Sequence, residues 1–237
     1  MLTFKKQRVL VIAPHPDDEV YGCGGFIARA KKEGAEVYVL YLAVGTTRDF
    51  SKKGLSKNSE RINEIKKVAK FLKLDGYRIA FPYDTHHLKL DVIPQKDIIH
   101  EIERGDKISL ENLKPTIVLA PTPHDYNQDH RAVYCAVVSA TRPVPNLFKH
   151  YVPHILCYEL PYTSWKTESY AEIPQLYISL AKEDLNKKIK ALNLYKSQLK
   201  GHDGPLSSNG IRALAEFRGL QTGSPYAEAF LVKRSII

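Results

Sequence analysis

The chain has 237 residues, 43% of them hydrophobic, which suffices for one sizeable core, and we expect a single domain over residues 1–237. Its formal net charge is +9, but the lysines are scattered and no arginine-rich stripe accompanies them, so the excess favours an anionic substrate group over nucleic acid. No apolar run approaches the ~18 residues that span a bilayer, and the N-terminus does not resemble a secretory signal, so we expect a cytoplasmic protein without a membrane span.

Strand-like and helix-like patterns alternate along the chain. The apolar run Arg8–Ala13 has the length of a buried strand, and apolar residues over 20–30 then recur at helical spacing until Gly34. By the same criteria, further strands are expected at 36–42, 78–81, 116–120, 155–159, 176–180 and 229–232, helices at 62–72, 92–103, 130–140, 182–198 and 211–217, and an exposed loop at 200–209. This alternation predicts an α/β fold with a mainly parallel sheet covered on both faces, in which ligands bind beyond the carboxyl ends of the strands.

Ionisable residues follow the first predicted strand directly. Residues 13–19 read APHPDDE, and the two prolines stiffen the turn around His15. His15 and Asp18 lie three residues apart, so the imidazole and the carboxylate can face one metal ion, with Asp17 projecting beside it. An aspartate before a helix is also a common helix cap, but a cap explains neither His15 nor the prolines.

A second polar cluster follows the predicted strand at 116–120. Residues 120–130 read APTPHDYNQDH, and a parallel sheet can place them beside the first cluster. A histidine from this cluster completes a set of two imidazoles and one carboxylate, which leaves one position open for water, as in catalytic zinc sites. On spacing alone, that histidine is either His124 or His130. The three cysteines are widely spaced without a CxxC pair, so they indicate neither a disulfide framework nor a zinc site.

Gly22, Gly24 and Gly25 open the first predicted helix without forming a dinucleotide-binding fingerprint. Their G-x-G-G spacing differs from G-x-G-x-x-G, and the carboxylates of Asp17 and Asp18 stand where a pyrophosphate would bind. We therefore expect these glycines to let the helix lie close to the sheet.

Taken together, the two clusters resemble the motifs of the PIG-L/LmbE-like deacetylase family. HPDDE at 15–19 and GCGG at 22–25 are similar to its first motif, and DYNQDHR at 125–131 is similar to its second. An R-x-x-E pair at 61–64 and YAEAF at 226–230 extend the resemblance over nearly the whole chain. The resemblance implies a Rossmann-like three-layer α/β sandwich and a zinc-dependent N-deacetylase. Members of the family remove acyl groups from N-acetylglucosamine in glycolipids, thiol precursors, chitin fragments and antibiotics.

Carried over position by position, the resemblance implies a role for each residue of the site. The family's metal ligands fall on His15, Asp18 and His130, and its general base falls on Asp17. Asp129 matches the aspartate that neighbours the last ligand.

Further positions concern the substrate. Arg61 and Asp84 match family residues that bind it. One position departs from the pattern, because many members carry a histidine, which stabilises the oxyanion or donates a proton, where this chain has Asn127. An asparagine can donate a hydrogen bond but cannot titrate. We therefore expect Asn127 to stabilise the oxyanion, and the leaving amine to take its proton either from Asp17 or from His124 beside the substrate.

The residues and the resemblance together predict a metal-dependent amide hydrolase that removes an N-acetyl group from an amino-sugar-like substrate, either an N-acetylglucosamine conjugate or a sugar nucleotide. Zinc is the expected ion, with Fe2+ as an alternative. A non-haem iron oxygenase uses a similar ligand set but leaves Asp17 without a task, and a non-catalytic binding module is compatible with the same fold. The sequence leaves the sugar, the acyl group and the oligomeric state open, including a homo-oligomer.

Overall fold

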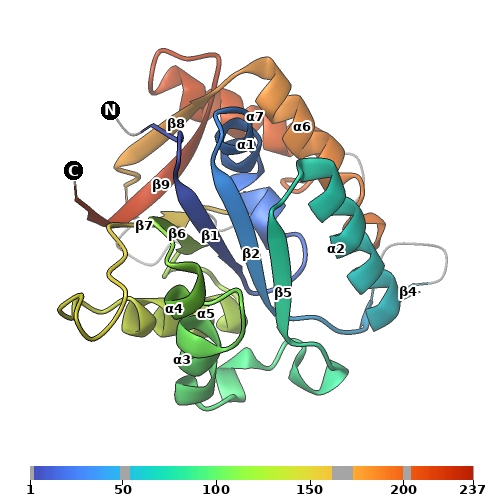
Figure 1. Ribbon diagram of the computed structural model, residues 1–237. Coiled ribbons are helices and arrows are strands. Elements are labelled where there is room, and N and C mark those ends of the chain that lie inside the picture. The colour runs from blue at the N-terminus through green and yellow to red at the C-terminus, as the bar shows by residue number, and fades with distance from the viewer. Residues whose placement is uncertain (1–2, 49–53, 162–172, 200–203, 237) are drawn as a thin grey trace.

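The computed structural model describes residues 3–48, 54–161, 173–199 and 204–236. Its centre is a seven-stranded sheet with the order β5-β2-β1-β6-β7-β9-β8 (Figure 1). The strands are β1 (Arg8–Ala13), β2 (Glu36–Ala43), β5 (Gly76–Phe81), β6 (Ile117–Pro121), β7 (His154–Tyr158), β8 (Leu176–Leu180) and β9 (Tyr226–Ser235). The strands from β5 to β7 are parallel, whereas β9 runs antiparallel to β7 and to β8. The predicted α/β fold with a mainly parallel sheet is thus confirmed.

Helices cover both faces of the sheet and give three layers (Figure 1). One face carries α1 (Asp18–Lys32), α2 (Asn58–Leu72), α6 (Lys182–Leu192) and α7 (Ser208–Leu220), and the other carries α3 (Gln95–Arg104), α4 (Leu110–Leu113) and α5 (Gln128–Ala140). Alternate residues of β1 serve the two layers. Val9 and Val11 lie in the core on the α1 side, and Leu10 and Ile12 lie in the core on the α5 side. Burial on both faces explains the unbroken apolar sequence of β1.

The long helix expected over 182–198 is shorter in the structure. It ends at Leu192, and a separate 3-10 turn follows at Lys196–Gln198. Tyr195 lies between them, is buried, and donates its hydroxyl hydrogen to Glu19. Tertiary contacts of this kind override a helical pattern in the sequence.

Other boundaries also differ from the prediction. The helix expected over 92–103 begins only at Gln95, because Pro94 precedes it and disfavours helical backbone in the residue before. The short strands β3 (Thr47–Arg48) and β4 (Leu55–Ser56) and the helix α4 were not predicted. In the loop expected at 200–209, residues 200–203 lie outside the described residues, and Ser208 already belongs to α7.

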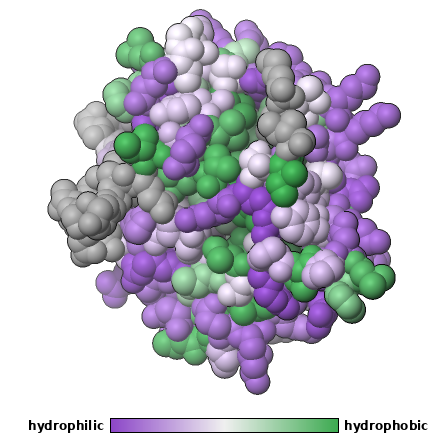
Figure 2. Space-filling model, turned by 90° about the vertical axis from the view of Figure 1, so that its left-hand side faces the viewer, coloured by the Kyte–Doolittle hydropathy of each residue, from purple (hydrophilic) through white to green (hydrophobic). Residues whose placement is uncertain are grey.

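Among the described residues, no helix combines the length and the apolar character that crossing a membrane requires. On the face seen in Figure 2, hydrophilic and hydrophobic side chains are interspersed.

Candidate metal centre

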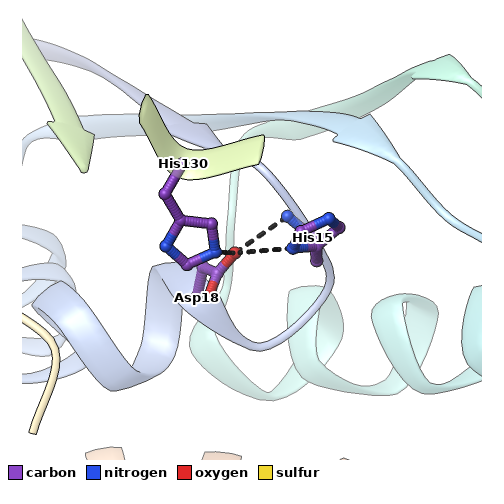
Figure 3. Close-up of side chains that lie close together, drawn as sticks. All are labelled: His15, Asp18 and His130. Atoms are coloured by element: carbon purple, nitrogen blue, oxygen red, sulfur yellow. Dashed lines mark hydrogen bonds and ion pairs between the residues drawn. The ribbon is translucent and has the colours of Figure 1, made fainter. Parts of the chain in front are cut away.

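His15, Asp18 and His130 come together at the carboxyl end of the parallel strands. His15 follows β1, Asp18 opens α1, and His130 lies in the first turn of α5, which follows β6. Because β1 and β6 are neighbouring parallel strands, both segments start from the same edge of the sheet. The three candidate ligand atoms lie within 4.8 Å of one another, and all three residues are buried (Figure 3).

Each of the two histidines is held on its outer side by a buried aspartate. His15 Nε2 lies 2.8 Å from Asp129 Oδ2, and His130 Nδ1 lies 2.7 Å from Asp125 Oδ2. Each carboxylate accepts the ring N–H, so the other ring nitrogen faces inward and carries a lone pair when the imidazole is neutral. Asp129 is fixed in turn by the backbone N–H of Leu90, at 2.9 Å. Histidines that bind metal ions are commonly oriented by such an outer carboxylate.

The inward-facing atoms are all acceptors when both imidazoles are neutral. Asp18 Oδ2 lies 3.5 Å from His15 Nδ1 and 3.3 Å from His130 Nε2. Burial alone lowers the pKa of His130, but the Asp18 charge and the hydrogen bond to Asp125 raise it to about 10. Burial raises the pKa of Asp18, yet the two imidazoles hold it well below its usual range. The centre therefore requires a cation, either a proton or a metal ion, and its donor set suits a divalent ion such as zinc.

Asp17 lies next to Asp18 in a strained backbone conformation. It occupies the N-cap position of α1 with φ 104° and ψ −27°, in the left-handed region. Its N–H donates to Glu19 Oε2 at 3.1 Å, and the buried Glu19 accepts the Tyr195 hydroxyl at 2.6 Å. Within the described helix α1, the Asp17 side chain makes no capping hydrogen bond, so the helix-cap alternative does not account for it. Strain of this kind clusters at functional sites.

Arg61 reaches the same turn from α2 and is almost fully buried. Its Nη2 donates to the Pro16 carbonyl and its Nη1 donates to the Gly45 carbonyl, both at 3.3 Å. Nη1 also lies 3.3 Å from Nε2 of His87, a buried residue that the sequence did not single out. The His87 ring stands nearly perpendicular to the His15 ring, with the centroids 5.6 Å apart. Burial, followed by the Arg61 charge, lowers the pKa of His87 to about 4, so its ring is neutral near pH 7.

The remaining predicted site residues, Asp84, Asn127 and His124, are not part of the His–Asp–His group. Asp84 is exposed and accepts the Thr46 N–H at 2.5 Å, the main cause that lowers its pKa. Asn127 caps α5, because its Oδ1 accepts the Asp129 N–H at 2.9 Å. His124 is exposed and lies outside the His–Asp–His group found among the described residues.

The predicted close approach of α1 to the sheet is confirmed. A side-chain carbon on Gly22 would lie 2.1 Å from the Tyr158 ring. The helix is kinked at Cys23, and Glu228 of β9 accepts two backbone N–H groups just beyond the kink. Lys188 forms an ion pair with this buried carboxylate, with its Nζ 2.6 Å from Glu228 Oε1. The YAEAF segment thus anchors the helix that carries the predicted metal ligand of the first motif.

The chain is similar in sequence and in fold to several known proteins. The family model for PIG-L, GlcNAc-PI de-N-acetylase, matches residues 10–141. The uncharacterised deacetylase YaiS of Escherichia coli is 29% identical over 196 residues, which is 81% of this chain and 92% of YaiS. The diacetylchitobiose deacetylase of Thermococcus kodakarensis is 26% identical over 234 residues, covering 94% of this chain and 81% of that protein. The crystal structure of the conserved protein TT1542 from Thermus thermophilus superposes with a TM-score of 0.75 at 26% identity, covering 98% of this chain and 96% of TT1542.

Proposed function

This chain belongs to the PIG-L family of GlcNAc-PI de-N-acetylases, and we propose that it is a metal-dependent hydrolase that removes the N-acetyl group of an amino-sugar-like substrate. The observation that carries this proposal is the buried set of His15, Asp18 and His130, with Asp17 beside it. The relative named for deacetylating diacetylchitobiose supports an N-acetylglucosamine-type substrate. The net charge of +9 favours a substrate with an anionic group, such as a sugar nucleotide.

When bound to His15, Asp18 and His130, a divalent ion such as zinc supplies Lewis acidity, which lowers the pKa of water toward ~7 and polarises an amide carbonyl. Asp17 is the general base: it takes a proton from the attacking water and returns it to the leaving amine, so that acetate and a free amine result. Asn127 donates a hydrogen bond to the oxyanion through its amide nitrogen, because its oxygen is engaged with the helix backbone.

The neighbouring residues orient these groups and contact the substrate. Asp129 is a positioning residue that holds the His15 ring. Arg61 contributes a buried positive charge beside the turn that carries Asp17. Asp84 and His124 are exposed and offer hydrogen-bonding groups to the parts of the substrate further from the amide.

The test is a screen of N-acetylated sugars for released free amine, with the metal content measured on the same preparation. We expect release from at least one N-acetylglucosamine conjugate, dependence on a divalent ion, and indifference to oxygen and 2-oxoglutarate. Turnover that requires oxygen and 2-oxoglutarate would instead identify an iron oxygenase. Tight sugar binding by metal-loaded protein without any release of amine would identify a binding module.

Asn127→Ala should lower both stability and turnover. Loss of the cap on α5 costs about 1 kcal/mol of unfolding free energy, and loss of an oxyanion donor costs about 3 kcal/mol of transition-state stabilisation, or ~10²-fold in rate. Asn127→Ser is the matched control, since serine caps a helix but lacks the amide donor. Turnover per metal-loaded folded molecule is the measurement. A normal rate in both variants limits Asn127 to its role as the cap of α5 and removes it from the mechanism.

Random-sequence duplex DNA should bind only weakly, with a dissociation constant no tighter than ~10⁻⁶ M at physiological salt. The reason is that the lysines are scattered rather than aligned along one stripe. Fluorescence anisotropy of labelled DNA over a salt series measures this dissociation constant.

A sugar nucleotide carrying N-acetylglucosamine should in contrast be turned over with a larger kcat/KM than the neutral sugar. The difference in kcat/KM should shrink as salt is added.

A further inference from the structure

His87 lies against the candidate metal centre, and the proposed mechanism gives it no role. It directly follows the 3-10 turn Asp84–His86 and is 9% exposed. Its ring contacts the ring of His15, a candidate metal ligand, and lies beside Arg61. A side-chain carbon on Gly45 would lie 2.3 Å from the His87 side chain, so glycine is needed there to make room for it.

The contact with Arg61 fixes which nitrogen of His87 carries the proton. A guanidinium can only donate, so Nε2, 3.3 Å from Arg61 Nη1, must accept. The proton of the neutral ring therefore resides on Nδ1. His87 Nδ1 and Arg61 Nε are both buried, and neither has a hydrogen-bond partner among the described residues. A buried donor without an acceptor is unfavourable. The His87 Nδ1–H and the Arg61 Nε–H are therefore two donors to which a ligand oxygen could bind.

The segment that carries His87 is hydrogen-bonded to residues of α5 and contains a strained backbone conformation. Leu88, the next residue, has φ 56°, which is strained for a large side chain. Its carbonyl accepts from Gln128 Nε2 at 3.4 Å, and the Leu90 N–H donates to Asp129, which holds His15. The contacts that orient a candidate metal ligand thus also fix the backbone next to His87.

We propose that His87 is a specificity-determining residue whose Nδ1–H donates to a hydroxyl oxygen of the amino sugar next to the scissile amide. This inference rests on the proposed function. In an N-acetylglucosamine conjugate, one ring carbon next to the acetamido group carries the conjugate and the other carries a hydroxyl group. A hydroxyl oxygen is an acceptor of the kind that the pair lacks. Tyr83, Asp84 and Leu88, close to His87 in the sequence, are exposed, so the segment that carries His87 lies at the protein surface.

Two substitutions separate the two nitrogens of His87. In His87→Gln the amide group replaces Nε2 and keeps an acceptor for Arg61, but the donor at Nδ1 is lost. In His87→Asn the amide nitrogen replaces Nδ1 and keeps the donor, but the acceptor for Arg61 is lost. His86→Gln, in the same turn, is the matched control. We expect kcat/KM to fall about tenfold to a hundredfold in His87→Gln, mainly through KM, and to change little in His86→Gln. We expect His87→Asn to stay closer to the wild type than His87→Gln.

Monodeoxy analogues of the substrate identify the acceptor. The wild type should discriminate about tenfold or more against one analogue, and His87→Gln should lose that discrimination, because the removed hydroxyl no longer has its donor. If His87→Gln discriminates among all analogues as the wild type does, the proposal is wrong and His87 serves only as the partner of Arg61. Nitrogen NMR of the imidazole gives a second readout, since a proton found on Nε2 also overturns the proposal. Failure of the proposed function has a different signature, in which the wild type releases no amine from any sugar.

Discussion

Asp17→Asn should keep the fold and the metal ion but lower turnover by ~10²–10⁴-fold, the usual effect of losing a general base. Asp17 has φ 104°, in a region that few residues other than glycine tolerate. Asparagine is among the residues that adopt left-handed backbone most readily, so this change removes the carboxylate without adding strain. Steady-state kinetics and metal content, measured on one preparation, check the prediction.

Asp17→Gly is the control that separates lost chemistry from lost stability. Glycine relieves the positive φ, so the thermal midpoint should be maintained or raised while turnover falls as it does in Asp17→Asn. A substitution at the exposed Asp91, Asp91→Asn, should leave both quantities unchanged. Loss of the metal ion from Asp17→Asn would contradict the assignment, because Asp17 rather than Asp18 would then be the ligand.

The central sheet was predictable because its strands are buried on both faces. Residues 9–13 are apolar without interruption, and a run of this length and composition indicates a strand buried between two helical layers. The helix expected over 182–198 was wrong beyond Leu192, because Tyr195 leaves the helical path to reach Glu19. A contact between residues so far apart in sequence has no local signal.

The meeting of the two polar clusters could also be anticipated, since each follows a strand of the same parallel sheet. Spacing left His124 and His130 as alternatives, and the structure brings His130 to His15 and Asp18 while His124 is exposed. His87 could not be found from sequence, because it follows no strand directly. Its position depends on Arg61 from another helix, a contact that no spacing rule contains.

The largest loss of activity is expected from the metal ligands. His130→Gln should remove the bound ion and reduce turnover by more than ~10³-fold, because the water and the carbonyl lose their Lewis acid. His124→Gln is the matched control and should keep one ion per chain. Asp129→Asn should weaken metal affinity by about 10–100-fold, since it keeps all three ligands but disturbs the hydrogen bond that orients His15. Retained metal in His130→Gln, or lost metal in His124→Gln, would show that the ligand set is wrong.

Protons should compete with the metal ion at this centre. Without metal, the Asp18 charge and the Asp125 hydrogen bond raise the pKa of His130 from 6.5 to about 10, so the imidazole is charged near neutral pH and stabilises the fold. That stabilisation is fully present below pH 6.5 and is lost as the pH rises through about 10. A metal ion replaces the proton, so metal-loaded protein should not lose this stabilisation at alkaline pH.

Calorimetric titration of zinc into metal-free protein at about pH 7, in two buffers of different ionisation enthalpy, should show about one proton released per ion. Zinc binding with no proton release would mean that the His130 imidazole is neutral before the ion binds. Asp18 would then be paired with a cation other than the protonated His130.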